Sequence, residues 1–188
     1  MRELDLAIFR AINGWPDWLE PVFLFFSEGN KWWPVRILLV GVLVFLLWKK
    51  STRTPAILAM VTWPIANAAT DWLKFGLQGA RPSAELVDAI VRVERLTSFG
   101  TASAHSANMM AVATAFMFYN RTAGIVWLAV ALLTGLSRIY VGVHYPYQVL
   151  FGWFVGFFVA FVAVMTWRSY LRLRQRPAES NESPPMDR

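Results

Sequence analysis

Cysteine is absent from the sequence and histidine occurs only twice. The absence of cysteine excludes disulfide bonds, thiolate catalysis and cysteine-ligated metal centres. Two histidines are too few for a histidine-based zinc site. The sequence also offers no acidic cluster that could supply oxygen ligands to Mg²⁺ or Ca²⁺. We therefore expect a protein that holds no metal and no cofactor.

Charge is absent from long stretches of the chain. Residues 149–167, "VLFGWFVGFFVAFVAVMTW", contain no charged side chain, and about 20 such residues suffice for a helix to cross a bilayer. The whole sequence is 56% hydrophobic, with a mean hydropathy of +0.42. A soluble domain of this length seldom carries so much apolar surface. The composition predicts an integral membrane protein.

The apolar segments predict an all-α, polytopic helix bundle with about six transmembrane helices. Five segments have the length of a crossing, and a shorter sixth leaves five or six full crossings open. They are residues 33–48, 54–76, 104–119, 123–141 and 146–167, with the short one between residues 16 and 27.

Three regions follow from this pattern. Residues 1–15 are too mixed in polarity for a signal peptide and predict an amphipathic helix at the membrane surface. Residues 16–170 form the transmembrane domain. Residues 171–188 predict a basic and then disordered cytoplasmic tail, since the final stretch is polar and rich in proline.

The distribution of charge predicts the orientation. The net charge is +6, but the basic residues lie at helix ends beside aromatic residues, which favours contact with a bilayer over nucleic acid. With six crossings, the face that carries both termini holds the larger and denser group of Lys and Arg. The positive-inside rule places that face in the cytoplasm.

Three polar stretches meet on the opposite, outer face. They are "KFGLQGARP" at 74–82, "SFGTASAHSAN" at 98–108 and "SRIYVGVHYPYQ" at 137–148. Each lies at the end of an apolar segment, so hydropathy alone brings two histidines and three cations together. These are Lys74, Arg81, His105, Arg138 and His144.

This combination suits a phosphate group. Arg binds phosphoryl oxygens through two parallel N–H groups, and Lys contributes a point charge. Ser103 and Ala104 lie where a helix is expected to begin, so their backbone N–H groups are expected to point at an anion. Two histidines can divide a displacement at phosphorus, one attacking and the other protonating the leaving oxygen. Taken singly, each feature fits an interfacial anchor, a helix cap or close helix packing; occurring together, they favour a site.

The three stretches resemble the signature of the type 2 phosphatidic acid phosphatase (PAP2) superfamily. That family carries K-x6-R-P, then P-S-G-H, then S-R-x5-H-x3-D. Here the blocks are Lys74-x6-Arg81-Pro82, "ASAH" at 102–105 and Ser137-Arg138-x5-His144-x3-Gln148. The resemblance runs from about residue 74 to 148. Ala102 and Ala104 replace the Pro and Gly of the second block, and Gln148 replaces the Asp.

The resemblance implies a role for each of these residues. His144 would be the nucleophile that forms a phosphohistidine, His105 the general acid, and Gln148 the partner of the His144 ring. The phosphoryl group would be held by Lys74, Arg81, Ser103, Ala104 and Arg138. No metal is needed by the family. Its substrates are phosphorylated membrane lipids: polyprenyl diphosphates, phosphatidylglycerophosphate, phosphatidic acid and lipid A phosphates.

The resemblance also implies a place in the cell and leaves alternatives open. Short bacterial members lie in the cytoplasmic membrane, here with the active site facing the exterior and both termini in the cytoplasm. The amide of Gln148 can accept the Nδ1–H of His144 but lacks the charge of a carboxylate. A non-catalytic protein that binds or moves phosphorylated lipids is therefore one alternative, and phosphoryl transfer to a second lipid is another. The oligomeric state stays open.

Two local features complete the predictions. Residues 83–96, "SAELVDAIVRVERL", form either a lid that selects the lipid head group or an amphipathic surface helix. Asp71 lies one turn before Lys74 and is expected to pair with it.

Overall fold

The computed structural model describes residues 2–96 and 98–175, and this part of the chain is entirely helical with connecting loops. It confirms the all-α class. The α-helices are α1 (Arg2–Asn13), α2 (Glu20–Glu28), α3 (Trp33–Trp48), α4 (Lys50–Leu77), α5 (Pro82–Glu85), α6 (Ala104–Met117), α7 (Arg121–Tyr140) and α8 (Pro146–Gln175). Two short 3₁₀ helices, Asp17–Leu19 and Gly29–Lys31, flank α2.

Helix α6 forms the centre of the bundle and packs against α4, α7 and α8. Small residues make this close packing possible. Ala66, Ala107, Ala111 and Ala160 are buried together where α4, α6 and α8 meet. Gly156 of α8 lies so near the carbonyl of Ala107 that an added Cβ would overlap it. Helices packed in membranes commonly use small residues in this way.

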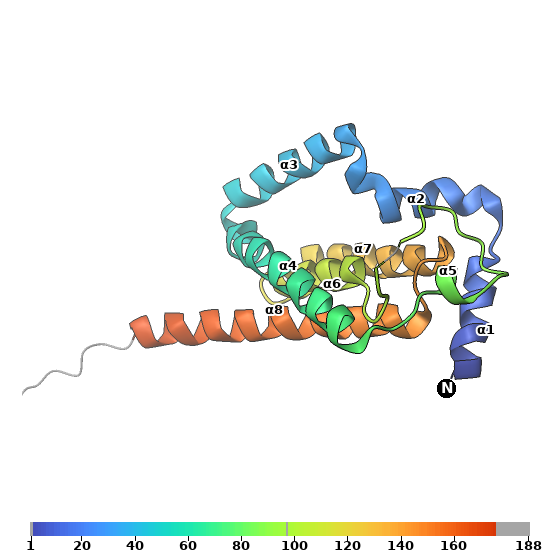
Figure 1. The fold of residues 1–188 in the computed structure, drawn as a ribbon. Coiled ribbons are helices and arrows are strands. Elements are labelled where there is room, and N and C mark those ends of the chain that lie inside the picture. Colours follow the sequence, from blue (N-terminus) through green and yellow to red (C-terminus); the bar gives the residue numbers. More distant parts are fainter. Residues whose placement is uncertain (1, 97, 176–188) are drawn as a thin grey trace, which may run out of the picture.

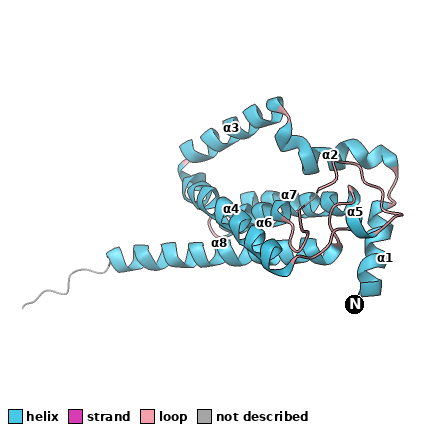
Figure 2. Cartoon of the chain, in the orientation of Figure 1, coloured by secondary structure: helices cyan, strands magenta, loops and turns pink. Residues whose placement is uncertain are grey.

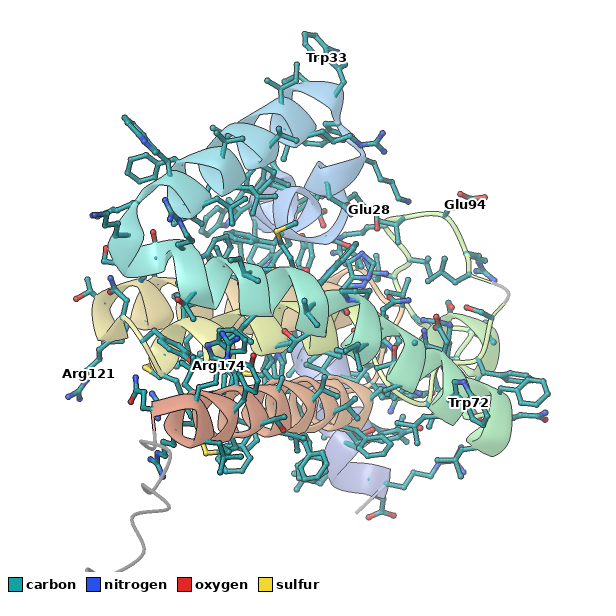
Figure 3. The ribbon with its side chains drawn as sticks, turned by 90° about the vertical axis from the view of Figure 1, so that its left-hand side faces the viewer. Glu28, Trp33, Trp72, Glu94, Arg121 and Arg174 are labelled. Carbon is teal, nitrogen blue, oxygen red and sulfur yellow. The ribbon has the colours of Figure 1, made fainter. Side chains whose placement is uncertain are left out.

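Two helices of the described chain, α7 and α8, are long and apolar enough to cross a membrane. The segments Asp17–Lys31 and Trp33–Trp48 pass the same test only as a pair, with a bend of 74° between them. Helix α6 has 14 residues and is about 21 Å long, less than the roughly 30 Å of a bilayer core. The number of six crossings therefore stays a prediction. Trp33 and Trp72 project outward from α3 and α4 (Figure 3), as interfacial tryptophans do.

Helix α1 lies across the end of the bundle at which most of the loops gather (Figures 1 and 2). Its Phe9 is buried against Ile139, Tyr145 and Val149, and its ring meets that of Tyr145 edge-on. Within the segment 1–15, residues 2–13 are helical as α1, and the apolar face of α1 covers the ends of α7 and α8. Its position at a membrane surface stays a prediction.

The loop after α5 differs from one of its two interpretations. Residues 82–85 are helical but residues 86–96 are not, so an amphipathic surface helix is wrong. The reason is that other segments bind this backbone. Asn13 bonds both the N–H and the carbonyl of Ile90, at 2.9 and 2.8 Å, and the N–H of Arg92 donates to Val141 at 3.2 Å. The role of the loop as a lid stays a prediction.

The predicted tail begins inside α8. Helix α8 continues to Gln175, so residues 171–175 are helical, with Arg172 and Arg174 in the last turn. The predicted disorder of the final stretch falls on residues 176–188, which lie outside the described residues.

Candidate active site

The turn between α7 and α8 places His144. The backbone carbonyl of Arg138, in the last turn of α7, accepts the N–H groups of Val143 and His144 at 3.2 and 3.1 Å. Gly142, which lies between Arg138 and Val143, has a φ of +81°, a conformation that favours glycine. A Cβ at this residue would also overlap the carbonyl oxygen of Ile90. The spacing from Arg138 to His144 is therefore that of a helix end followed by one tight turn.

Hydrogen-bond partners determine the tautomer of His144. The Nη1 of Arg81 lies 3.0 Å from its Nε2, and the Oε1 of Gln148 lies 3.0 Å from its Nδ1. Because a guanidinium can only donate, Nε2 must be the acceptor and carry the lone pair. The proton therefore lies on Nδ1, which donates to Gln148. This is the tautomer that a nucleophilic Nε2 requires.

Gln148 is buried and bonded through both ends of its amide. Its Oε1 also accepts the N–H of Tyr145 at 3.2 Å, and its Nε2 donates to the carbonyl of Ala80 at 2.7 Å and to the hydroxyl of Tyr147 at 3.0 Å. Since the Ala80 carbonyl can only accept, the amide is fixed with its oxygen toward His144. Gln148 therefore joins the loop before Arg81 to the loop that carries His144.

Arg81 is a candidate phosphate ligand, and its hydrogen bonds also connect the loops that surround it. It is 4% exposed, and each of its five N–H groups has a partner. Nε donates to the carbonyl of Ser98 at 2.6 Å, and Nη2 donates to the Ser98 hydroxyl and the Phe99 carbonyl, both at 3.1 Å. Nη1 donates to the Val143 carbonyl at 3.0 Å and to His144. A phosphoryl oxygen can therefore take a bond from Arg81 only by displacing one of these partners.

Electrostatics keep His144 neutral. Burial, followed by the positive charges of Arg81 and Arg138, lowers its pKa well below the usual value of 6.5. The lone pair on Nε2 is therefore not lost to protonation at neutral pH. In this arrangement the same lone pair is covered by the Nη1–H of Arg81.

Two further predicted phosphate ligands are paired with carboxylates. The Nζ of Lys74 lies 2.8 Å from Oδ1 of Asp71, the pairing expected from the sequence. Arg138 is buried, and its Nη1 donates to the carbonyl of Ser27 at 3.3 Å, to the Ser27 hydroxyl and to Oε1 of Glu28 at 2.9 Å. The structure does not join the side chain of Lys74 or Arg138 to that of His144 by a hydrogen bond.

The start of α6 differs in part from expectation. Ser103 caps the helix, since its hydroxyl accepts the N–H of Ser106 at 3.4 Å. Its own N–H is not free for an anion, because it donates to the backbone carbonyl of Gln148 at 3.0 Å. Within residues 2–96 and 98–175, the N–H of Ala104 has no partner and remains a candidate donor.

His105 opens onto a cavity. Its half-buried ring lines a space of about 390 Å³ together with Trp63 and Asn67 of α4 and Asn108 of α6. In the described part of the chain the ring makes no hydrogen bond.

The sequence predicted the histidines and cations of the site but not the residues that form hydrogen bonds with them. The missed residues are Ser27, Glu28, Ala80, Ser98 and Tyr147. Ser98, Ala80 and Tyr147 act through backbone atoms or local contacts, which no residue pattern reveals. Glu28 did offer a signal, because it is an acid at the end of an apolar segment. Across the described residues, no group of three or more His, Cys, Asp or Glu side chains could hold a metal ion.

Comparison with known proteins decides the family. The sequence profile of the PAP2 superfamily matches residues 54–172. The chain belongs to the PAP2 superfamily. This membership and the apolar helices mark it as a membrane protein, and the matched range contains all three signature blocks.

Relatives of this PAP2 protein are similar over most of their length. It is 28% identical over 165 residues to an undecaprenyl-diphosphatase of Sulfolobus acidocaldarius, covering 85% of this chain and 77% of that protein. It is 29% identical over 164 residues to the undecaprenyl-diphosphatase BcrC of Bacillus subtilis, covering 85% and 82%. A bacitracin transport permease protein BcrC of Bacillus licheniformis is 26% identical over 158 residues, covering 82% and 76%.

Solved structures share the fold. The crystal structure of Aquifex aeolicus LpxE superposes with a TM-score of 0.68 at 25% identity, covering 86% of this chain and 95% of that one. A transmembrane PAP2 type phosphatidylglycerolphosphate phosphatase from Bacillus subtilis superposes with a TM-score of 0.69, covering 89% and 86%. At 21% identity, the second likeness concerns the fold alone.

Proposed function

We propose that this protein is a metal-independent lipid phosphatase that removes the terminal phosphate of a polyprenyl diphosphate. The observation that carries the proposal is the buried, neutral His144, with Nε2 facing Arg81 and Nδ1–H held by Gln148. Family membership supports phosphatase chemistry on a lipid. The names of two relatives, both undecaprenyl-diphosphatases, support the diphosphate.

The reaction begins at His144. The phosphoryl oxygens draw Nη1 of Arg81 away from Nε2, which frees the lone pair for in-line attack on the terminal phosphorus. The bond from phosphorus to the bridging oxygen breaks as the bond from phosphorus to Nε2 forms. His105 gives its proton to that bridging oxygen, and the lipid monophosphate leaves.

The second half returns the enzyme to its starting state. A water molecule attacks the phosphorus of phosphohistidine and gives its proton to His105, and the phosphorus–nitrogen bond breaks to release inorganic phosphate. Arg81, Arg138, Lys74 and the N–H of Ala104 stabilise the charge on the equatorial oxygens. These cations take the place that a divalent metal holds in other phosphoryl-transfer sites.

A non-catalytic lipid-binding or transport protein is the second candidate. Two observations favour it: Gln148 supplies no negative charge behind His144, and Arg81 covers Nε2. One relative is also named a transport permease. Binding alone does not require His105 as an acid, so catalysis remains the stronger proposal.

The proposal is tested by phosphate release in detergent from a panel of lipid phosphates. The panel holds a polyprenyl diphosphate, its monophosphate, phosphatidylglycerophosphate, phosphatidic acid and a lipid A phosphate, each with and without EDTA. We expect release from the polyprenyl diphosphate at the highest kcat/KM, unchanged by EDTA. Inactivity on all five with retained lipid binding would establish the non-catalytic candidate, and loss on chelation that Mg²⁺ restores would refute the mechanism.

A further inference from the structure

A carboxylate from the neighbouring helix α2, which packs against α7, meets Arg138. Helix α2 ends at Glu28, the chain passes through Gly29–Lys31, and α3 then departs at 74° to the preceding segment. At this break the side chain of Glu28 is 16% exposed and lies on the inner side of the chain, away from Trp33 (Figure 3). Its Oε1 lies 2.9 Å from Nη1 of Arg138, and its Oε2 pairs with Lys31.

The bonds of Arg138 are confined to one side of its guanidinium. All of its side-chain hydrogen bonds run from Nη1, and all end on Ser27 and Glu28. Its Nε is buried and has no partner among the described residues. A buried donor without a partner is costly unless a ligand satisfies it. Among the described residues the N–H groups of Nη2 have no hydrogen-bond partner either. The arrangement therefore fixes Nη1 and leaves the edge formed by Nε and Nη2 for an incoming acceptor.

Glu28 also makes the buried charge of Arg138 tolerable. Arg138 is 2% exposed, and a buried guanidinium needs a counter-ion. Within the described chain, Glu28 is the carboxylate that lies within ion-pair distance of Arg138. Because the backbone carbonyl of Arg138 holds His144, any shift of this arginine also reaches the turn that carries the nucleophile.

We propose that Glu28 is a positioning residue for the reaction: it aims Arg138 so that the free edge formed by Nε and Nη2 binds phosphoryl oxygens. The break between α2 and α3 lies at this carboxylate, beside the last turn of α7 that carries Arg138. The inference rests on the proposed phosphatase function and adds a residue that lies outside the three signature blocks.

A double-mutant cycle tests the inference. Glu28→Ala is expected to lower kcat/KM by about 30-fold or more, the usual result of removing one partner of a buried charge pair. Glu28→Gln keeps the length and the acceptor oxygen, so its loss is expected to be smaller. In an Arg138→Ala background, Glu28→Ala is expected to change kcat/KM by less than about threefold, because Glu28 acts through Arg138.

The control is Glu20→Gln, which alters another glutamate of α2 that faces an arginine, Arg92, at 3.8 Å. It is expected to leave kcat/KM unchanged. An equal loss from Glu28→Ala in the wild-type and Arg138→Ala backgrounds would overturn the inference, as would full activity of Glu28→Ala. If Glu28→Ala does not fold, the same cycle is run with Glu28→Gln.

A second measurement separates this inference from the proposed function. Orthovanadate, a phosphate mimic, is expected to raise the melting temperature of the wild type and of Glu20→Gln, but not of Glu28→Ala. This readout needs no turnover. Inactivity of the wild type on every lipid would refute the proposed function alone, whereas an unchanged vanadate shift in Glu28→Ala would refute the positioning role.

Discussion

At the scale of single residues, the neighbours of Gln148 require both a hydrogen-bond acceptor and a donor, which an amide supplies. Its Nε2 lies 2.7 Å from the carbonyl oxygen of Ala80, and its Oε1 accepts from His144 and Tyr145. A carboxylate at residue 148 would accept a stronger hydrogen bond from His144, but it could not donate to the Ala80 carbonyl. The effect of a charge at residue 148 therefore depends on where the second carboxylate oxygen lies.

Replacing Gln148 separates these two effects. We expect Gln148→Asp to raise kcat, because it restores an anion behind His144 while drawing back from Ala80 by one methylene. The kcat of Gln148→Glu is expected to be lower than that of Gln148→Asp, because the second carboxylate oxygen of Glu faces the Ala80 carbonyl. Gln148→Leu is expected to lower kcat by about 10- to 100-fold, because it leaves the Nδ1–H of His144 unpaired. The measurement is steady-state phosphate release; equal rates for Gln148→Leu and wild type would show that Gln148 does not orient His144.

The neutral state of His144 predicts a dependence of stability on pH. Its folded pKa lies below the unfolded value of about 6.5, chiefly through burial and then through Arg81, Arg138 and Lys74. Below pH 6.5 the unfolded chain therefore binds a proton that the folded chain does not. The free energy of unfolding is expected to fall by up to about 1.4 kcal/mol for each pH unit of acidification below 6.5.

Thermal unfolding in detergent between pH 7.5 and 5 measures this effect. His144→Gln, which cannot titrate, is expected to lose less stability over the same range. Parallel curves for the variant and the wild type would show that the pKa of His144 is the same in the folded and the unfolded chain.

At the scale of elements, α1 and the loop over residues 86–96 are held together by one buried amide. Asn13 bonds both polar groups of Ile90 and donates to the carbonyl of Tyr140 at the end of α7. Arg92 adds bonds to the carbonyls of Asn13 and Tyr140 at 2.9 and 3.0 Å. These bonds fix the loop beside the turn that carries His144.

Asn13→Ala is therefore expected to lower the melting temperature and to loosen this loop. It leaves the N–H and the carbonyl of Ile90 without their side-chain partner, whereas the Tyr140 carbonyl keeps its bond from Arg92. Leaving a buried polar group unpaired costs about 1–3 kcal/mol, and these part-buried groups are expected to fall at the lower end. Limited proteolysis is expected to cut the variant faster within residues 86–96. Glu94→Ala is the control, because Glu94 is exposed on the same loop (Figure 3) and should change neither property.

The sequence revealed those elements and site residues whose signal is local. Uninterrupted apolar runs predicted α3, α7 and α8, because lipid-facing and core-facing residues are both hydrophobic. Signature spacing predicted that Arg81, His144 and Gln148 belong to one site, and the structure joins them directly. The loop over residues 86–96 could not be predicted, since its shape follows from Asn13, which lies 77 residues from Ile90. The partnership of Glu28 with Arg138 spans 110 residues and was hidden for the same reason.

At the scale of the whole molecule, the candidate site lies at one end of the bundle, where the connections from α4 to α6 and from α7 to α8 meet (Figure 1). The N–H of Ser103 binds the carbonyl of Gln148, so the two connections are joined by the backbone as well as by side chains. Lys74 and Arg138, with their carboxylate partners, add charge at the same end. This assembly is what we propose makes His144 a nucleophile toward phosphorus.

A covalent phosphohistidine at His144 can be trapped and located. Wild-type protein is mixed with a polyprenyl diphosphate labelled in its terminal phosphate and quenched within milliseconds into alkaline denaturant, in which phosphohistidine survives. Peptide mapping is expected to find the label on His144 of the wild type and no label in His144→Ala. Turnover by the wild type with no label on the chain, or label retained in His144→Ala, would show that His144 is not the nucleophile.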